Sequence, residues 1–363
     1  MASSEKAALM EKTVDAAATG RVWTLKLRQF LLLFAITALA ALAGMILLPQ
    51  DKYLRYQALN DHVAPHAYWI YERIHSDPTP IDIAFLGSSR TGRSIHSARL
   101  EADLAQRGVA AKAVNFYMFK SGRNMHYAVA KELLENRRVG LLVLEMTEWE
   151  DRKPHPDFVF LADPEDIVFA PLFINFNYLS DLGRLPGRQV DLFLETTLRG
   201  SGLRQPDFVP PPYEGSNLDI AEYLVTLDGR KHYFTQEHSL QYMEGLRIRQ
   251  ESEITPPVLP ASLHWLEYRF PRYYIDRILE LAARKGTRVV FLYVPRYAGP
   301  LDPPPYRMYT SRAGLINPQL GLQQNFRVWD DETHLNWGGA SAFTDAVAEQ
   351  LVSGRYLQLQ PHE

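Results

Sequence analysis

Apolar residues along the chain follow two alternating patterns: short continuous runs, and longer stretches with an apolar residue at every third or fourth position. Runs of strand length occur at Ile81–Leu86, Val139–Leu144 and Val289–Val294. Two further segments, Ala113–Phe119 and Phe326–Trp329, are also predicted as strands. Because the three runs are apolar at nearly every position, they are typical of strands that are covered on both faces.

Helical spacing occurs between these runs. Leu100 and Leu104, followed by a stop at Gly108, predict a helix that begins near Ser97. Three more helices are predicted from the sets Met125, Val129 and Leu133; Ile275, Ile278, Leu279 and Ala282; and Phe343, Val347 and Leu351. The alternation of strand and helix predicts an α/β fold of three layers, with a parallel sheet whose functional site lies at the carboxyl ends of the strands.

A long uncharged stretch, residues 29–48, lies near the N-terminus. At about 1.5 Å per residue it is long enough to cross a hydrocarbon core of about 30 Å as a helix. Ala-Leu-Ala triplets within it also fit a cleaved secretory signal, but the apolar run continues past them to Leu48, which favours an uncleaved anchor.

The charges beside this stretch predict its orientation. Arg21, Lys26 and Arg28 precede it, whereas the basic residues that follow it, Lys52 and Arg55, come with Asp51. Basic residues are retained in the cytoplasm, so residues 1–28 are predicted to be a cytoplasmic segment and the rest of the chain to lie outside.

The amino-acid composition excludes few classes of binding partner. The 39 basic and 42 acidic residues give a net charge of -3, so the chain has no electrostatic footprint for nucleic acid. It has no cysteine and therefore no disulfide, so an oxidising compartment is permitted but not indicated.

Prolines divide the chain after the anchor. Between residues 150 and 260 they interrupt every long period, so this stretch is predicted to be an insertion. It is either a lid or docking surface for a polymer or a membrane partner, or an irregular subdomain that only packs on the sheet. Residues 81–149 and 261–363 then form the α/β domain, and residues 49–80 are a linker.

Two short motifs follow predicted strands and carry reactive side chains. Gly87-Ser88-Ser89 ends the first run, and Asp331-Glu332-Thr333-His334 follows the last predicted strand. Their residue types predict a triad in which Ser89 is the nucleophile, His334 the base and Asp331 the group that orients the imidazole. The alternative is that the acidic residues cap a turn before the last helix and His334 is a surface residue.

These motifs resemble those of the SGNH (GDSL-type) hydrolases, in which the nucleophile closes a Gly-Asp-Ser motif after the first strand and an Asp-x-x-His motif precedes the last helix. The resemblance covers the predicted sheet elements and implies a flavodoxin-like parallel sheet. It also implies that the backbone N–H groups of Ser89 and Gly122 form the oxyanion hole. Ser88 replaces the family's aspartate, a form familiar from membrane-anchored members that act on cell-envelope polymers.

The chain departs from the family at the third block. The family has Gly-x-Asn-Asp after the third strand, where the asparagine donates to the oxyanion, but Glu145-Met146-Thr147-Glu148 stands here. Without a replacement, such a loss costs a few kcal/mol of transition-state stabilisation. Asn124 or Thr147 could substitute, so Asn124 joins Gly122 as a candidate oxyanion donor, and Arg90 is a candidate substrate-binding residue.

The resemblance also implies a class of function. Single-span members are similar to polysaccharide O-acetyltransferases and teichoic-acid D-alanylation proteins, which work with a multi-span membrane-bound O-acyltransferase. It therefore implies an O-acyltransferase or esterase at a bacterial inner membrane, facing the periplasm or exterior, that acts on envelope or exported polysaccharide without a cofactor. Transfer and hydrolysis share their first half-reaction, so the sequence does not separate them.

Three other classes of function fit parts of the sequence. A non-catalytic shell that binds polysaccharide or positions membrane partners fits the missing asparagine and the aromatic-rich insertion. Residues 87–94 match a phosphate-binding loop, but Arg93 replaces the lysine that reaches the phosphates. His62 and His66 have the helical spacing of metal ligands, but Pro65 between them favours surface histidines, and no metal site is predicted.

Overall fold

Strands from distant parts of the sequence form one all-parallel sheet, which in the part of the chain described below has five strands in the order β2-β1-β3-β6-β7. The strands are β1 (Ile81–Gly87), β2 (Ala113–Tyr117), β3 (Val139–Met146), β6 (Arg288–Tyr293) and β7 (Gly314–Ile316). The computed structural model describes residues 26–59, 66–120, 122–203, 209–219, 223–225, 230–252, 256–303 and 313–357. The predicted α/β class with a parallel sheet is confirmed.

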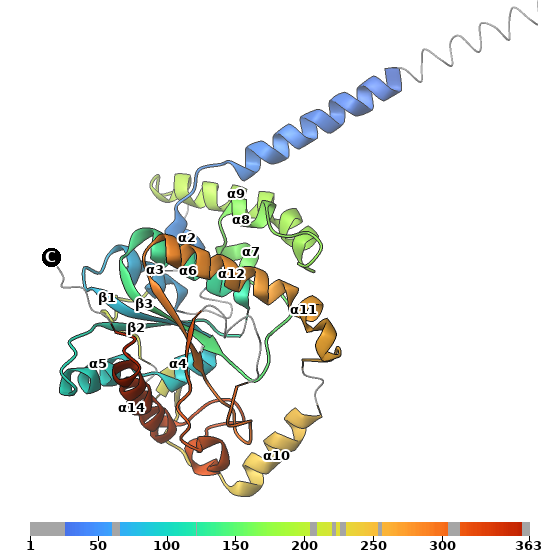
Figure 1. Cartoon of the computed structure of the whole chain (residues 1–363). Coiled ribbons are helices and arrows are strands. Elements are labelled where there is room, and N and C mark those ends of the chain that lie inside the picture. Colours follow the sequence, from blue (N-terminus) through green and yellow to red (C-terminus); the bar gives the residue numbers. More distant parts are fainter. Residues whose placement is uncertain are drawn as a thin grey trace, which may run out of the picture.

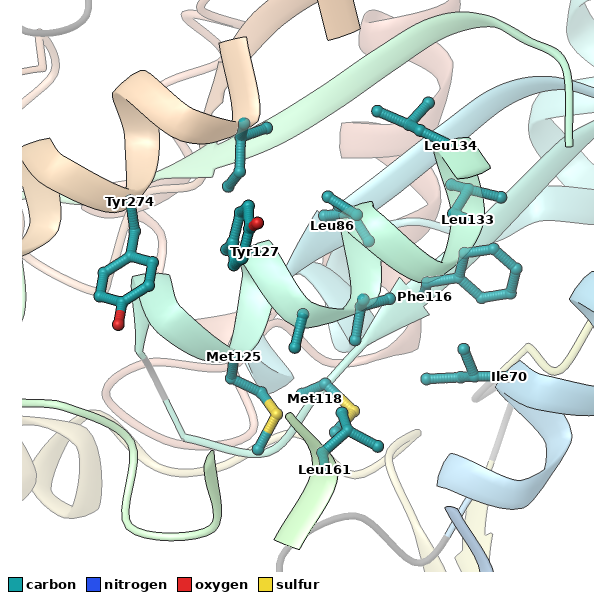
Figure 2. Packing of buried hydrophobic residues seen from close by; sticks show 14 of the residues in the cluster. Ile70, Leu86, Phe116, Met118, Met125, Tyr127, Leu133, Leu134, Leu161 and Tyr274 are labelled. Atoms are coloured by element: carbon teal, nitrogen blue, oxygen red, sulfur yellow. The ribbon is translucent and has the colours of Figure 1, made fainter. Parts of the chain in front are cut away.

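Helices cover both faces of the sheet (Figure 1). On one face lie α2 (Lys52–Gln57), α3 (Ala67–His75), α6 (Arg123–Asn136) and α12 (Arg269–Arg284), and on the other lie α5 (Ser97–Gln106) and α14 (Trp337–Ser353). Successive strand residues point to opposite faces. Accordingly, Ala84 and Leu86 pack into the first layer, part of which Figure 2 shows, while Ile83 and Phe85 pack into the second.

The order of the strands identifies the edge of the sheet at which folds of this kind bind ligands. In chain order the sheet runs second, first, third, fourth, fifth, so the connection from β1 to β2 and the connection from β3 to β6 leave toward opposite sides of the sheet. Open α/β sheets bind their ligands at such a reversal, beyond the carboxyl ends of the strands. Here that point lies between the ends of β1 and β3, where Gly87 and Met146 are the last strand residues.

The prediction of a strand at Phe326–Trp329 was wrong. Residues Phe326–Val328 form the 3-10 helix η3, which begins after Asn325, whose side chain accepts a hydrogen bond from the backbone of Arg327. Trp329 is fully buried and donates its indole N–H to the Leu322 carbonyl. The apolar residues of this segment therefore pack as a turn, and the fifth strand is the three-residue β7.

The prediction that residues 49–80 form a linker was also wrong, because this stretch contributes α2 and α3 to the core. Trp69 and Ile70 of α3 are almost fully buried, and the ring of Trp69 meets that of Phe116 edge-on. An apolar helix face of this kind is buried wherever a sheet surface is available to it.

The predicted insertion is more regular than its prolines suggested. It contains α7 (Phe158–Leu161), α8 (Pro164–Val168), α9 (Tyr178–Arg199), β4 (Tyr223–Val225), β5 (Lys231–Tyr233) and α10 (Leu240–Glu251), and η1 (Ala261–Leu263) and α11 (His264–Glu267) follow. Helix α9 continues through Pro186, although proline removes one backbone hydrogen bond. The apolar side chains of α7 join the first core layer.

A single helix in the described part of the chain, Lys26–Ile46, is long and apolar enough to span a membrane, with a mean hydropathy of 2.2. It contains most of the predicted residues 29–48 and projects away from the domain (Figure 1). A secretory signal would meet the same criteria of length and composition.

Candidate active site

The turn that follows β1 presents Ser89. Strand β1 ends at Gly87, Ser88 caps the short helix α4 (Ser89–Ser94), and its hydroxyl accepts a hydrogen bond from the backbone of Arg90. A Cβ on Gly87 would lie 2.2 Å from the Thr91 hydroxyl oxygen. Only glycine allows this close approach, so the sequence itself dictates a tight strand-to-helix turn.

Ser89, His334 and Asp331 form a continuous hydrogen-bonded chain. Ser89 Oγ lies 2.8 Å from His334 Nε2, and His334 Nδ1 lies 2.7 Å from Asp331 Oδ2. Nδ1–H donates a hydrogen bond to the carboxylate, which leaves the lone pair of Nε2 directed at the serine hydroxyl. The structure thus brings together two segments that are 245 positions apart in the sequence.

Asp331 is held as an ionised acceptor. Its Oδ1 accepts hydrogen bonds from the backbone N–H groups of Thr333 and His334, both at 2.8 Å. Burial raises the pKa of this carboxyl, but the hydrogen bond and charge of His334 and these two N–H donors outweigh burial and hold the pKa well below its usual range. Asp331 therefore remains negatively charged and holds the His334 ring by the hydrogen bond to Nδ1.

Glu145, near the end of β3, forms hydrogen bonds to the turn that carries Ser89. Within the described residues its Oε2 accepts four hydrogen bonds: from the backbone N–H and hydroxyl of Ser88, both at 2.9 Å, and from the backbone N–H and hydroxyl of Thr91, at 3.1 and 2.6 Å. The parallel pairing of β1 with β3 places Glu145 beside Gly87. Sequence analysis missed this role, and a carboxylate at the end of an apolar run was its only signal.

Arg93 holds the loop that carries His334. Its Nη2 donates to the Leu335 carbonyl at 3.1 Å and lies 3.3 Å from Asp330 Oδ2, so it grips the loop on both sides of the histidine. The ring of Phe234, from the predicted insertion, covers the Arg93 guanidinium at 3.1 Å. The insertion therefore makes a cation–π contact with the α4 side chain that binds the His334 loop.

Gly122 and Asn124 lie at the start of α6, on the same edge of the sheet. The first residue of α6, Arg123, donates to the Glu145 carbonyl at 2.7 Å, which ties this helix end to β3. A Cβ on Gly122 would lie 2.5 Å from that of His155. Asn124 Oδ1 accepts a hydrogen bond from the His155 backbone, while its buried Nδ2 has no partner among the described residues.

The other two candidates are engaged elsewhere. The Arg90 guanidinium forms hydrogen bonds to both carboxylate oxygens of Glu148, at 2.8 and 3.0 Å, and another to the Val294 carbonyl. It therefore joins the ends of β3 and β6 and is not directed at a substrate. The Thr147 hydroxyl donates to the Trp149 carbonyl. Of the two proposed replacements for the missing asparagine, Asn124 is thus the one with an unused donor.

Packing accounts for the glycine spacing that resembles a phosphate-binding loop. A Cβ on Gly92 would lie 2.5 Å from the ring of Tyr117, so this glycine is required by the close approach of the ring. The Arg93 guanidinium already binds Asp330 and Leu335, in the loop that carries His334. The packing of Gly92 and the contacts of Arg93 therefore account for these two residues without a bound nucleotide.

The prediction that His62 and His66 are surface histidines fails at His66. His62 lies outside the described residues, and His66 is buried rather than at the surface, with Nε2 2.6 Å from the Tyr117 carbonyl. Burial lowers the pKa of His66 to about 4. The acidic cluster Asp163, Glu165 and Asp166 already surrounds the Lys131 ammonium, at 2.7 to 3.1 Å.

Comparison with known proteins adds no assignment, since no family model matches the chain and no curated protein matches its sequence. An α/β fold alone supports many unrelated chemistries. The function must therefore be argued from the side chains that meet at the carboxyl edge of the sheet.

Proposed function

We propose that the protein is a membrane-anchored, SGNH-like serine acyltransferase or esterase that forms a seryl ester on Ser89. The observation that carries this proposal is the unbroken chain Ser89 Oγ, His334 Nε2, His334 Nδ1, Asp331 Oδ2, with successive contacts of 2.8 and 2.7 Å. A nucleophile, a base and an ionised orienting group at these separations are the parts of an acyl-transfer triad.

The reaction follows from the positions of the protons. As Ser89 Oγ attacks the acyl carbonyl, its proton passes to His334 Nε2, and the same proton is then delivered to the leaving oxygen. In the second half-reaction an acceptor hydroxyl gives its proton to Nε2 and attacks the seryl ester carbonyl. The bond from the acyl carbon to Ser89 Oγ then breaks, and Nε2 returns the proton to Oγ, which restores the free serine. A sugar hydroxyl as acceptor makes the reaction a transfer, and water makes it a hydrolysis.

The oxyanion would be stabilised by donors at the start of two helices. Ser89 is the first residue of α4, so its backbone N–H is not used within that helix, and Gly122 is the cap of α6. The unpartnered Asn124 Nδ2 beside Gly122 is the side-chain donor that we assign in place of the family's missing asparagine.

The helix Lys26–Ile46 supports a location at a membrane. With residues 1–28 in the cytoplasm, the triad would face the periplasm or exterior of a bacterial inner membrane, where envelope or exported polysaccharide supplies hydroxyl acceptors. A membrane-bound O-acyltransferase is the partner class that would deliver acyl groups to that side.

Labelling with a fluorophosphonate tests the proposal. The full-length protein in detergent should be labelled at Ser89, while Ser89→Ala should abolish labelling and His334→Ala should slow it strongly. Ser180→Ala, at an exposed serine of α9, is the matched control and should leave labelling unchanged. Absence of labelling in a folded wild-type protein would count against an activated nucleophile.

A non-catalytic polysaccharide-binding shell is the second candidate. It is favoured because Thr147, which lies in the block where the family's asparagine is missing, already donates its hydroxyl to the Trp149 carbonyl and is not free to replace that asparagine. Such a shell would bind polymer equally well with and without Ser89. It would also show no labelling in the fluorophosphonate assay, so the same variants distinguish the two functions.

A further inference from the structure

Large apolar side chains are exposed between α8 and α9. We call residues 169–179 the apolar loop, and its exposed members are Phe169, Leu172, Phe173, Phe176 and Leu179. Phe173 is 91% exposed and Phe176 83% exposed. Single exposed apolar residues are common, but a contiguous group of this size marks a surface that meets an apolar partner.

The loop carries no charge. Its sequence is FAPLFINFNYL, and the first charged residue after it is Asp181, whose side chain is buried. Protein-binding surfaces usually have a polar rim, whereas a segment that enters the acyl boundary of a bilayer must be uncharged and is typically rich in aromatic residues.

Helix α9 extends this surface. The face that it buries against the domain carries Asp181, Leu185, Gln189 and Leu192. A second line of side chains, Leu182, Pro186, Val190 and Phe193, recurs at helical spacing and is only half-buried. At about 100° per residue this second line lies roughly 100° around the helix from the buried face. Helix α9 thus has an apolar flank that the domain leaves partly open.

The position of α9 identifies what covers this surface. Gln189 Nε2 donates to the carbonyl of Ile46, the last residue of the membrane-length helix, at 3.1 Å. In the last turn of α9, the Thr196 hydroxyl accepts a hydrogen bond from the Asp51 backbone at 3.0 Å, whereas Gln189 lies at the middle of the helix. Figure 1 shows α8 and α9 on the side of the domain from which the N-terminal helix projects. If that helix spans a bilayer, α9 lies where the bilayer surface must be.

We propose that the apolar loop and the open flank of α9 insert into the outer-leaflet interface of the bilayer that holds the N-terminal helix. The anchor and α9 then contact the membrane together and fix the orientation of the α/β domain above it. This proposal does not depend on the chemistry at Ser89, because a binding shell would be held at the membrane in the same way.

Lipid quenching tests the proposal directly, because the chain has no cysteine and single reporters can be placed at will. Phe173→Cys carries a bimane fluorophore in the full-length protein, reconstituted in vesicles of phosphatidylethanolamine and phosphatidylglycerol with spin-labelled lipids. Ile248→Cys on α10 is the matched control, since it is also apolar and 61% exposed but lies far from the N-terminal helix (Figure 1).

Spin-labelled lipids should quench the reporter at residue 173 about twofold or more and should leave that at residue 248 nearly unchanged. Equal quenching at the two positions would overturn the proposal. Since the vesicles contain no other protein, a surface that binds only a protein partner gives no quenching at residue 173. A surface that pairs with a second copy gives a signal that depends on protein density rather than on spin-labelled lipid, and this result would also refute insertion.

A second variant separates insertion from mere proximity to the anchor. Phe173→Ser together with Phe176→Ser, read by a reporter at Leu179→Cys, should lower lipid quenching at residue 179 by about half or more. The thermal midpoint should stay unchanged, because both phenylalanines are exposed. Quenching that persists undiminished would show that the aromatic side chains do not enter the lipid.

Discussion

Replacement of Glu145 with glutamine replaces one carboxylate oxygen by an NH2 group and removes the charge, while the side chain keeps its size. Glu145 Oε2 accepts four hydrogen bonds from Ser88 and Thr91 in the described structure. An amide oxygen has two lone pairs, so the glutamine can keep two of the four hydrogen bonds. These are most readily the two from the backbone N–H groups, since the two hydroxyls can rotate toward other acceptors. The glutamine variant therefore loses two charge-assisted bonds and weakens two more.

The magnitude follows from these counts. A hydrogen bond to a charged group contributes about 1.5–3 kcal/mol, and rotation of the hydroxyls recovers part of the loss, so Glu145→Gln should reduce the free energy of unfolding by about 2–4 kcal/mol. For a domain of this size that corresponds to a drop of roughly 4–8 °C in the thermal midpoint. Because Ser88 and Thr91 flank the nucleophile, fluorophosphonate labelling of Ser89 should also slow by about tenfold or more.

Thermal unfolding and labelling rates of the full-length protein in detergent measure both effects. Glu135→Gln is the matched control, because Glu135 lies exposed on α6 and should tolerate the same chemical change. A midpoint for Glu145→Gln that equals the control, together with an unchanged labelling rate, would refute the role assigned to this carboxylate in supporting the nucleophile turn.

Four further changes probe other parts of the structure. Arg93→Lys should slow turnover about tenfold with little change in KM, because lysine cannot grip the loop on both sides of His334; steady-state kinetics measure this. Asp331→Asn should lower the labelling rate about 10³-fold or more. Asp331→Asn should also lower the free energy of unfolding relative to wild type. This loss should be fully present above about pH 4, the pKa of the unfolded carboxyl, and should disappear as pH falls toward the lowered pKa of the folded state; thermal melts across pH measure it. Burial raises the pKa of Asp181 to about 6, although Arg184 opposes the shift, so Asp181→Asn should stabilise the protein by about 1–3 kcal/mol at pH 7, and this gain should vanish as pH falls from 6 to below 4. Asn124→Ala should slow labelling by about 10- to 100-fold if its Nδ2 serves the oxyanion, and an unchanged rate would remove it from the site.

The predictions that agree with the structure rest on short-range patterns. The runs at β1, β3 and β6 and the helical spacing at α5, α6, α12 and α14 report burial on both faces or on one face, which neighbouring residues determine locally. Ser89 and His334 were paired from the residue types of their two motifs, and the structure brings them together although the segment before His334 is a 3-10 helix rather than a strand.

Where the predictions failed, side-chain contacts that the apolar pattern does not report outweighed that pattern. Phe326–Val328 has the composition of a strand, but the burial of Trp329 and the side-chain cap of Asn325 make it a turn. The segment predicted as a linker becomes two core helices because the sheet offers a surface for Trp69. Periodicity within a segment carries no information about what will cover it.

By itself, the sequence determined the α/β alternation, an apolar helix of membrane length and the identity of the three side chains that form the hydrogen-bonded chain, Ser89, His334 and Asp331. The tertiary structure alone decided that Glu145 supports the turn that carries Ser89, that Arg93, covered by Phe234, binds the loop that carries His334, and that α9 lies beside the end of the apolar helix. The physical reason is that burial periodicity is encoded in neighbouring residues, whereas hydrogen bonds and ion pairs between distant segments depend on how the whole chain packs.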